Sequence, residues 1–522
     1  MSAFYEELSK SKIVSDETEN KQSRANVDKW IFILLLVMLG TVPLIVFANV
    51  EEVISPLISS NDLLSSGAKG DIFTHYKSIL LILFTIILSV MLLIKVYFMN
   101  GSIRKTFLNY ILGIFALVIV ITTIASPNIT IALNGQYNRS DGAITWLCYI
   151  TLLFIILNIE MPKNTIRYIM YTLLPFVYIN FYLITMNFWD KDLLQNSGVQ
   201  KFVSIFLIEG ASISGDSQLV GTLNQWNYMS GMFAIITIMY LAWAITSKKI
   251  ITIFIGIITA VISMSIVFMS VSTSGFITVI VMITIIIFTG FIYLDKKVVS
   301  VVLVSFFVIV TPIFNLLAEK DSKVWEESFG FFINKNPYIE EVGKISLKSN
   351  VAFASDQVIK LPVLPERGIS AGTGRLYIWE KTFDLIQERP ILGYGKDTII
   401  YNFPHYNIDA RSGLRDENTI TDKTHNEYMG ILYGFGVLGL LSFLIIAGKL
   451  FINFWRSLKK RNSDIYILSS AGCAYFMQLL FNDSLPGISI VMFIIIGMSL
   501  TLEIKYREID CHGRNSRVSQ NN

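Results

Sequence analysis

Long apolar runs, separated by short polar segments, make up most of this chain. A helix needs about 20 mostly apolar residues to cross the hydrocarbon core of a bilayer. By this criterion the pattern predicts about twelve transmembrane helices. Their approximate limits are 30–48, 78–98, 107–125, 143–159, 167–187, 228–246, 250–269, 274–293, 298–316, 428–451, 465–481 and 486–503. The sequence therefore predicts an all-α integral membrane protein.

Two polar tails and one long polar interruption frame the predicted helices. The predicted division has an N-terminal tail (1–29), helices one to nine (30–316), a large loop (317–426), helices ten to twelve (427–503) and a C-terminal tail (504–522). The N-terminal tail holds no short apolar core that ends in a small-residue cleavage site. We therefore expect the first apolar run to remain in the protein as a helix.

Composition agrees with the membrane class. Of the 522 residues, 53% are hydrophobic and 16% are charged, whereas about a quarter of the residues in soluble domains are charged. The net charge of +3 gives no argument for binding nucleic acid. The three cysteines lack the spacing of metal ligands, so we expect no zinc site and no disulfide framework. We also expect no cofactor.

Basic residues are concentrated in alternate loops between the predicted helices. Arg104 and Lys105 lie in the second loop and Lys248 and Lys249 in the sixth, and both tails are also rich in lysine and arginine. Such residues mark the cytoplasmic side of a membrane protein. We therefore expect both tails in the cytoplasm and the large loop between helices nine and ten outside it.

The large loop contains one amphipathic segment. Leu376, Trp379, Phe383 and Ile386 recur at spacings of three and four, which places them on one face of a helix. Pro390 ends this helix, and the stretch "ILGYG" that follows supplies two glycines for a turn. The pattern predicts a helix that lies on the membrane domain or its surface.

The residues at the start of this helix are of the kind that bind an anion. Thr373 and Gly374 precede Arg375, so accessible backbone amides and a guanidinium occur together. Helix N-termini of this kind bind phosphate groups. An ordinary capped surface helix with a solvated Arg375 explains the same pattern.

A histidine stands directly before the tenth predicted helix. His425 and Asn426 lie in the stretch "DKTHNEYMGILYGFGVLGLL", so the imidazole falls near the outer membrane surface. A group that titrates near neutral pH can take up or release a proton there. A histidine that only anchors the end of a helix is the structural alternative.

Taken in order, these motifs resemble a known family. The "GR" helix, the "GYG" turn and the "HN" pair follow the stretches "LNGQYNRSDGAITWL" and "GTLNQWNYMSG" and precede "FNDSLPGISI". This order resembles the O-antigen ligase and Wzy-type polymerase family of bacterial membrane glycosyltransferases. The resemblance covers about residues 107 to 503 and is densest from 370 to 440.

The resemblance implies transfer of a glycan from undecaprenyl pyrophosphate to a hydroxyl group on an acceptor. The reaction occurs at the outer face of the cytoplasmic membrane, inverts the anomeric centre and uses no metal. By position in the motifs, His425 is the implied general base and Arg375 the leading cation for the diphosphate. The implied substrate-binding residues are Arg139, Thr373, Gly374 and Asn426. For Arg139, a solvated residue at the membrane interface is the alternative.

The chain departs from the pattern of the family at one position, and the resemblance does not identify the acceptor. Many relatives carry an arginine at the outer turn between helices seven and eight, where this chain has Ser274 and Gly275. The acceptor is either another lipid-linked glycan, as in a polymerase, or a different glycan, lipid or protein, as in a ligase. A flippase and a chain-length regulator are the further partners that such an enzyme implies.

Two other protein classes fit twelve spans. A transporter or flippase usually places ionisable residues at mid-membrane and often shows internal repeats. The predicted spans here are almost free of charge and show no repeat, which favours chemistry at the outer surface. A structural membrane scaffold is the third class.

Overall fold

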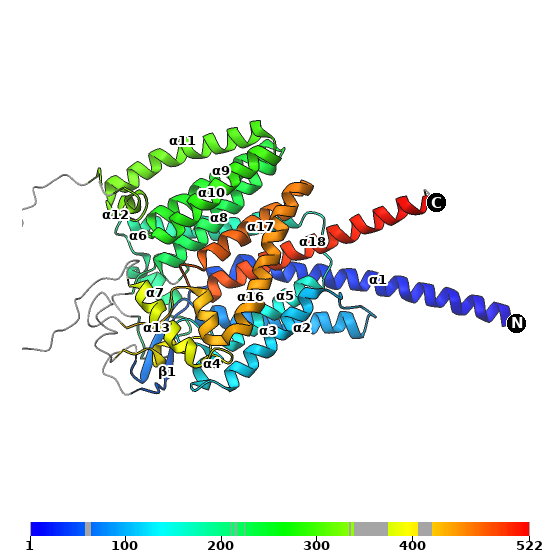
Figure 1. The fold of residues 1–522 in the computed structure, drawn as a ribbon, viewed down its shortest axis with the longest axis horizontal. Coiled ribbons are helices and arrows are strands. Elements are labelled where there is room, and N and C mark those ends of the chain that lie inside the picture. The colour runs from blue at the N-terminus through cyan, green and yellow to red at the C-terminus, as the bar shows by residue number, and fades with distance from the viewer. Residues whose placement is uncertain are drawn as a thin grey trace, which may run out of the picture.

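The computed structural model describes residues 2–57, 64–208, 210–213, 217–223, 225–333, 336–338, 374–405 and 420–520. Nearly all of the regular structure in these residues is helical (Figure 1). The long helices are α1 (Ser2–Thr41), α2 (His75–Tyr97), α3 (Phe107–Ile124), α5 (Ala143–Leu157), α6 (Thr165–Phe188), α8 (Trp226–Thr246), α9 (Ile250–Met269), α10 (Thr273–Tyr293), α11 (Lys296–Lys320), α13 (Arg375–Glu388), α16 (Glu427–Lys460), α17 (Ser463–Gln478) and α18 (Pro486–Gln520). The short helices are α4 (Ile129–Asn134), α7 (Ser197–Val203), α12 (Lys323–Glu326) and α14 (Ile399–Asn402).

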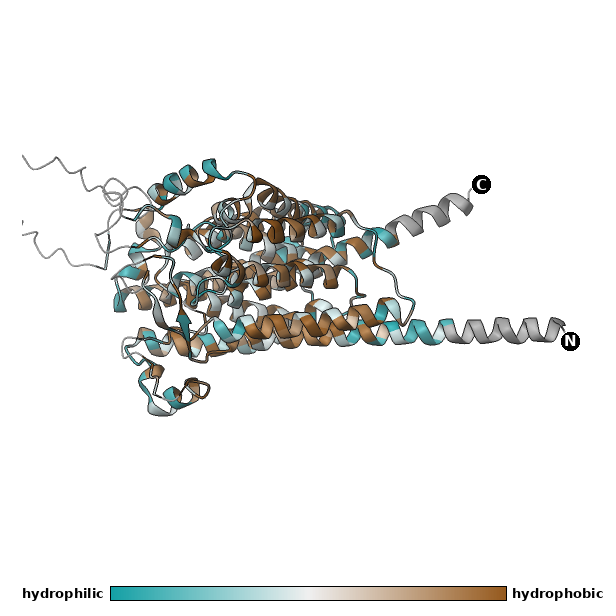
Figure 2. Cartoon of the chain, turned by 90° about the horizontal axis from the view of Figure 1, so that it is seen from below, coloured by the Kyte–Doolittle hydropathy of each residue, from teal (hydrophilic) through white to brown (hydrophobic). Residues whose placement is uncertain are grey.

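Helix α8 lies at the centre of the bundle. Every residue from Tyr228 to Ile245 is buried, and the helix packs against α9, α10 and α17. A helix that is apolar on all sides must be covered by other helices or by lipid. By contrast, α2 and α3 leave large apolar side chains exposed. Figure 2 shows that the long helices are mostly apolar. The outer helices thus present a surface suited to hydrocarbon.

The predicted all-α membrane class is confirmed, but the predicted count of twelve spans is not. Each of the twelve predicted segments overlaps a helix. Within the described residues, ten helices are long and apolar enough to cross a membrane. The other two, α5 and α17, have only 15 and 16 residues. Polar segments before α5 and after α17 shorten both helices, and these segments build the site described below.

A small antiparallel hairpin, which the helical pattern did not predict, joins α1 to α2. Strands β1 (Asn49–Val53) and β2 (Gly67–Asp71) pair from Asn49 with Asp71 to Val53 with Gly67. The Asp71 carboxylate then accepts hydrogen bonds from the backbone amides of Thr74 (2.8 Å) and His75 (2.7 Å). These bonds satisfy amides that would otherwise be unpaired at the start of α2.

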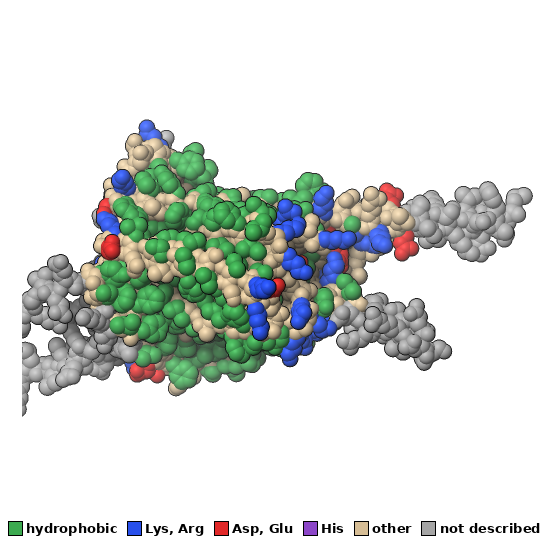
Figure 3. Space-filling model, turned by 90° about the horizontal axis from the view of Figure 1, so that it is seen from above, with side chains coloured by type: hydrophobic (Ala, Val, Ile, Leu, Met, Phe, Trp, Pro, Cys, Tyr) green, Lys and Arg blue, Asp and Glu red, His purple; other side chains and the backbone are tan. Residues whose placement is uncertain are grey.

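The two ends of the bundle differ. Both termini leave from one end, whereas β1, α4, α7 and α13 lie at the opposite end (Figure 1). Lysine and arginine side chains gather toward the end with the termini (Figure 3). We call the end that carries α13 the site end and the other the terminal end. The side of the membrane that each end faces stays a prediction.

Candidate active site

The helix predicted from the "GTGRLYIW" stretch is present as α13. It begins at Arg375, and Gly374 before it has a left-handed conformation with φ of 85°. Glycine adopts this conformation without the steric cost that a side chain adds. Thr373, the predicted cap, lies outside the described residues. Arg375 is half-buried and has no hydrogen bond or ion pair to a described residue.

The buried face of α13 differs from the predicted one. Ile386 is buried as expected, but Leu376 and Phe383 are 51% and 48% exposed. Tyr377 and Thr382 are buried instead. The helix packs on α16, and this contact determines which residues are covered. Spacing alone did not show that a threonine would face inward.

A kink in α16 holds the turn that follows α13. Gly436 has φ of 66° and interrupts the helix. The backbone amide of Val437 therefore donates to the carbonyl of Pro390 at 2.9 Å. This leaves the carbonyl of Tyr433 available, and it accepts the amide of Tyr394 at 2.9 Å. Two segments far apart in sequence are joined by backbone hydrogen bonds.

The two glycines of the "GYG" turn allow this close approach. Gly393 and Gly395 have φ of 62° and 91°. A Cβ atom at Gly393 would lie 2.6 Å from the carbonyl oxygen of Gly434. The predicted turn is confirmed. It places Lys396 against α16 and Asp397 beside Arg139.

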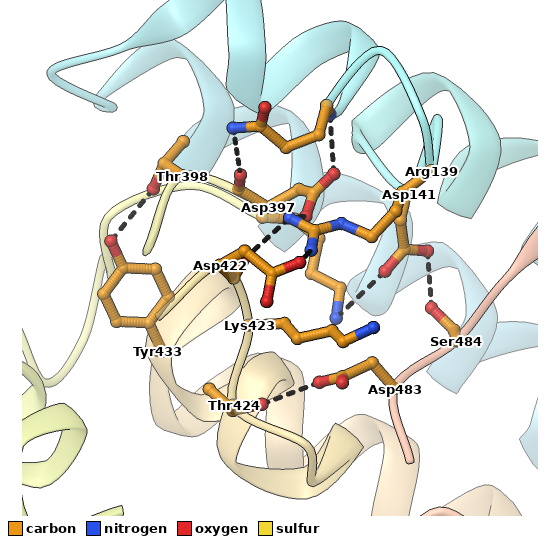
Figure 4. A network of polar contacts seen from close by, with 12 residues as sticks. Arg139, Asp141, Asp397, Thr398, Asp422, Lys423, Thr424, Tyr433, Asp483 and Ser484 are labelled. Carbon is orange, nitrogen blue, oxygen red and sulfur yellow. Dashed lines mark hydrogen bonds and ion pairs between the residues drawn. The ribbon is translucent and has the colours of Figure 1, made fainter. Parts of the chain in front are cut away.

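Arg139 is enclosed by two aspartates (Figure 4). Its guanidinium lies 2.6 Å from Asp397 and 2.8 Å from Asp422, and the residue is 3% exposed. Burial opposes the charge of Arg139, but Asp397 and Asp422 outweigh it and raise the pKa of the guanidinium. Arg139 therefore joins the segment before α5 to the end of the large loop, and its charge is already neutralised.

Lys396 forms a second buried cluster beside the first. Its ammonium lies 2.6 Å from Glu427 and 3.2 Å from Asp141. The amide of Ser484 donates to Glu427 at 2.7 Å, and the hydroxyl of Ser484 donates to Asp141. Burial raises the pKa of Asp141 to about 6, although Lys396 acts in the opposite direction. Buried charges need partners of this kind, so the two clusters hold four chain segments together.

His425 lies directly beside these clusters. Its backbone is left-handed with φ of 51°, a conformation that is strained for a residue with a side chain. Ring atom Nδ1 is buried and has no hydrogen-bond partner among the described residues. The Asn426 side chain accepts the amide of Met429 at 3.2 Å and caps α16, so Asn426 has a structural role. Its predicted contact with substrate stays a prediction.

The surroundings of His425 favour the neutral imidazole. Burial lowers the pKa of His425 to about 4, and the charges of Lys423 and Arg375 act in the same direction. The carboxylates of Asp483 and Asp422 oppose this shift but do not cancel it. At pH 7 the ring is therefore unprotonated and able to accept a proton. Arg375, the other residue predicted for catalysis, is thus among the charges that act on His425.

Asp483 is a carboxylate that the sequence analysis did not single out. Its Oδ1 atom accepts the hydroxyl of Thr424 at 2.8 Å, and its buried Oδ2 atom has no partner among the described residues. Of the surrounding charges, Asp483 has the largest effect on both His425 and Arg375. Burial lowers the pKa of Arg375, and Asp483 partly offsets this. Asp483 therefore links the two predicted residues electrostatically.

Lys423 is, with Arg375, one of two cations at this site that have no ion pair among the described residues. It is 7% exposed, lies over the ring of Tyr228 at 5.0 Å and makes only long contacts of 3.4 Å with Gln225 and the Tyr228 hydroxyl. Lys423 lines a cavity of about 20 Å³ together with Arg139 and Lys396. That volume holds about one water molecule. Figure 4 shows Lys423 and Asp483 beside the two ion-pair clusters.

Some features of the sequence point to the site residues that were not predicted from it. Asp483 lies in the quoted stretch "FNDSLPGISI", and Lys423 lies two positions before His425. Lys396 and Asp397 directly follow the glycine turn. A charged residue at the end of an apolar span indicates a candidate functional position. It does not show which residue the charge pairs with. Within the described residues, no three histidine, cysteine or carboxylate side chains are grouped as metal ligands.

Part of the chain matches a known family model. Residues 258–444 match the model of the O-antigen ligase family. The matched range contains Arg375, Lys396, Lys423 and His425 but not Arg139. No curated protein matches the chain. The match confirms the resemblance that the order of the motifs indicated.

Proposed function

We propose that this multi-pass membrane protein, which carries an O-antigen ligase domain over residues 258–444, is a glycosyltransferase of surface polysaccharide synthesis. Its donor is a glycan on undecaprenyl pyrophosphate, and its acceptor is a hydroxyl group at the outer face of the bacterial cytoplasmic membrane. One observation carries the proposal: a neutral, half-buried histidine lies near two cations that have no ion pair among the described residues.

In the proposed reaction His425 acts as the general base. The acceptor oxygen attacks the anomeric carbon of the donor sugar while its proton passes to the imidazole. The new carbon–oxygen bond forms as the bond from that carbon to the pyrophosphate oxygen breaks, with inversion. A diphosphate bound beside His425 adds negative charge and raises the pKa of the ring above its value of about 4. Donor binding thereby makes the base stronger.

Arg375 and Lys423 stabilise the departing pyrophosphate. Neither has an ion pair among the described residues, so their charge is available to a ligand. Fixed cations aimed at developing negative charge are among the largest contributors to catalysis. Arg139 differs because Asp397 and Asp422 already hold it. Its ion pairs favour a positioning role, and direct contact with substrate stays a prediction.

Lys423 is our candidate to compensate for the arginine missing between α9 and α10. Ser274 is 5% exposed there, and a Cβ atom at Gly275 would lie 2.1 Å from the Ser230 hydroxyl. Helices α8 and α10 therefore approach too closely for a large side chain at Gly275. Lys423 brings a cation to the site from the large loop instead.

The position of the charges favours a transferase over a carrier. The ion pairs of Lys396 and Arg139 involve segments next to helix ends at the site end of the bundle. Carriers usually hold their ionisable groups near mid-membrane. The proposed partners are the lipid bilayer, the lipid-linked donor, a glycan or lipid acceptor, and a flippase and chain-length regulator.

A reconstituted assay tests this proposal. The purified protein is placed in liposomes with lipid-linked donor and either more donor or a lipid acceptor. We expect a new glycosidic linkage and release of undecaprenyl pyrophosphate, and the acceptor that reacts distinguishes polymerase from ligase. Movement of intact donor across the membrane with no new linkage would support the carrier and contradict the proposal.

A further inference from the structure

A second polar cavity lies at the terminal end of the bundle. It has a volume of about 550 Å³ and is formed by α1, the end of α2, the segment 98–106 and the segment after α5. Figure 3 shows lysine and arginine side chains gathered toward this end. None of the site-end residues lines this cavity. Its volume is large enough for a small ligand or a lipid headgroup.

The lining of the cavity carries excess positive charge. It contains the cations Lys21, Arg24, Lys29, Lys95 and Arg104 but only the carboxylates Asp28 and Glu160. The pairs Lys95–Asp28, at 2.6 Å, and Arg104–Glu160 use both carboxylates. Lys21, Arg24 and Lys29 have no carboxylate partner among the described residues. Three unneutralised cations around one cavity favour an anionic ligand.

Internal hydrogen bonds hold the walls of the cavity in place. Lys95 also donates to the carbonyl of Asn158 at 2.9 Å, and the Asn158 side chain accepts the amide of Arg104 at 2.8 Å. The Arg24 guanidinium donates to the carbonyls of Met99 (2.8 Å) and Asn100 (3.1 Å). The cationic wall is therefore built by contacts between α1 and the α2–α3 connection.

Exposed aromatic residues adjoin the same walls. Tyr97 and Phe98 are 75% and 81% exposed just after Lys95, and Phe107 and Tyr110 are 67% and 66% exposed just after Arg104. Aromatic side chains at such positions mark the boundary between lipid and water. The cavity thus lies next to the exposed apolar faces of α2 and α3, where the pattern of residues favours a lipid–water boundary.

We propose that this cavity binds the headgroup of an anionic phospholipid of the surrounding membrane. The phosphate lies among Lys21, Arg24 and Lys29, and the acyl chains follow the exposed apolar side chains of α2 and α3. A soluble anion would use the cations only, whereas a phospholipid also covers the aromatic and apolar surface. Cationic clusters of this kind attract anionic lipids. The inference does not depend on glycan transfer.

Lipid binding to the full-length protein in neutral detergent tests the proposal. Bound lipid is counted by native mass spectrometry, and the melting temperature is measured with added phosphatidylglycerol, phosphatidylcholine or inorganic phosphate. We expect phosphatidylglycerol to bind and to raise the melting temperature, while phosphatidylcholine and inorganic phosphate have little effect. Equal binding of the two lipids, or equal stabilisation by inorganic phosphate, would overturn the proposal.

A charge variant locates the site. Each lysine near a lipid surface contributes about fivefold to affinity, so Lys21→Gln with Lys29→Gln is expected to weaken phosphatidylglycerol binding about twentyfold. Both side chains are exposed, so the fold should persist. The matched control is Lys248→Gln with Lys249→Gln, another exposed pair that does not line the cavity. An equal loss of binding in both double variants would contradict a site in this cavity.

Discussion

The cations at the site end differ in whether they already form ion pairs with carboxylates. Arg139 and Lys396 are each paired with two carboxylates, at 2.6 to 3.2 Å. Arg375 and Lys423 have no such pair among the described residues. Removing a partner from a buried ion pair leaves an uncompensated charge, so changes at Arg139 and Lys396 affect folding. Changes at Arg375 and Lys423 test ligand binding more directly.

Arg375→Ala is expected to reduce glycan transfer by at least about a hundredfold while protein level and melting temperature stay near those of the parent. Arg375→Lys should restore only part of the rate, because an ammonium lacks the planar fork of the guanidinium. The measurement is initial rate in the reconstituted assay. Lys381→Gln on the same helix is the control, since that side chain pairs only with α13 residues. A fully active Arg375→Ala variant would remove Arg375 from the donor site.

Asp483 is expected to increase the basicity of His425 through its negative charge. Asp483→Asn removes the carboxylate that most favours protonation of the ring, so the pKa of His425 should fall below its value of about 4. The acid limb of the profile of kcat/KM against pH should move to lower pH. The rate at neutral pH should also fall, by about tenfold or more, because a weaker base remains. An unchanged profile would assign Asp483 a structural role only.

At the scale of elements, α13 and α16 form one unit through the turn between them. The kink at Gly436 exposes backbone carbonyls that the "GYG" turn uses, and Trp379 donates to the carbonyl of Thr424 at 2.8 Å. The helix that carries Arg375 is thereby tied to the segment that carries Lys423 and His425. The site depends on this junction more than on either helix alone.

Gly393→Ala is expected to destabilise the protein by about 1–3 kcal/mol, because φ is 62° there and the new Cβ atom would meet the Gly434 carbonyl at 2.6 Å. Gly448→Ala in α16 is the matched control. No atom lies within 4 Å of its Cβ position, and alanine favours a helix, so stability should hold or rise by up to about 1 kcal/mol. Melting temperatures in detergent measure both changes. Equal stability of the two variants would contradict the close packing of the turn.

The sequence predicted the elements better than their contacts. Apolar length located the helices, and the order of the motifs indicated the O-antigen ligase family, whose model matches residues 258–444. The face of α13 was predicted incorrectly at Leu376 and Phe383, because spacing does not show which partner a helix packs against. The bond from Ser484 to Asp141 joins residues 343 positions apart, and no local pattern specifies such a partner.

At the scale of the whole molecule, the two ends of the bundle carry different chemistry. The site end holds paired clusters around a neutral histidine, and the terminal end holds an open basic cavity. The membrane class follows from the exposed apolar helices between them. This arrangement separates the proposed reaction surface from the proposed site for anionic lipid.

Cysteine labelling tests the orientation of the two ends. In a background without native cysteines, Ser197→Cys and Ser102→Cys are each treated with an impermeant thiol reagent on sealed cells. Both positions are exposed; Ser102 lies in the basic second loop and Ser197 in α7 at the site end. We expect Ser197→Cys to react at once and Ser102→Cys only after the membrane is opened. The reverse order would place the site in the cytoplasm.

The most direct test of the account is the rate of glycosidic bond formation by His425 variants. With purified lipid-linked donor, His425→Ala and His425→Gln should each lower the rate by about a hundredfold or more, while donor binding stays near that of the parent. His75→Ala, at the histidine that begins α2, is the control and should retain the parent rate. A His425→Gln variant that forms the new linkage at the parent rate would contradict general-base catalysis at this site.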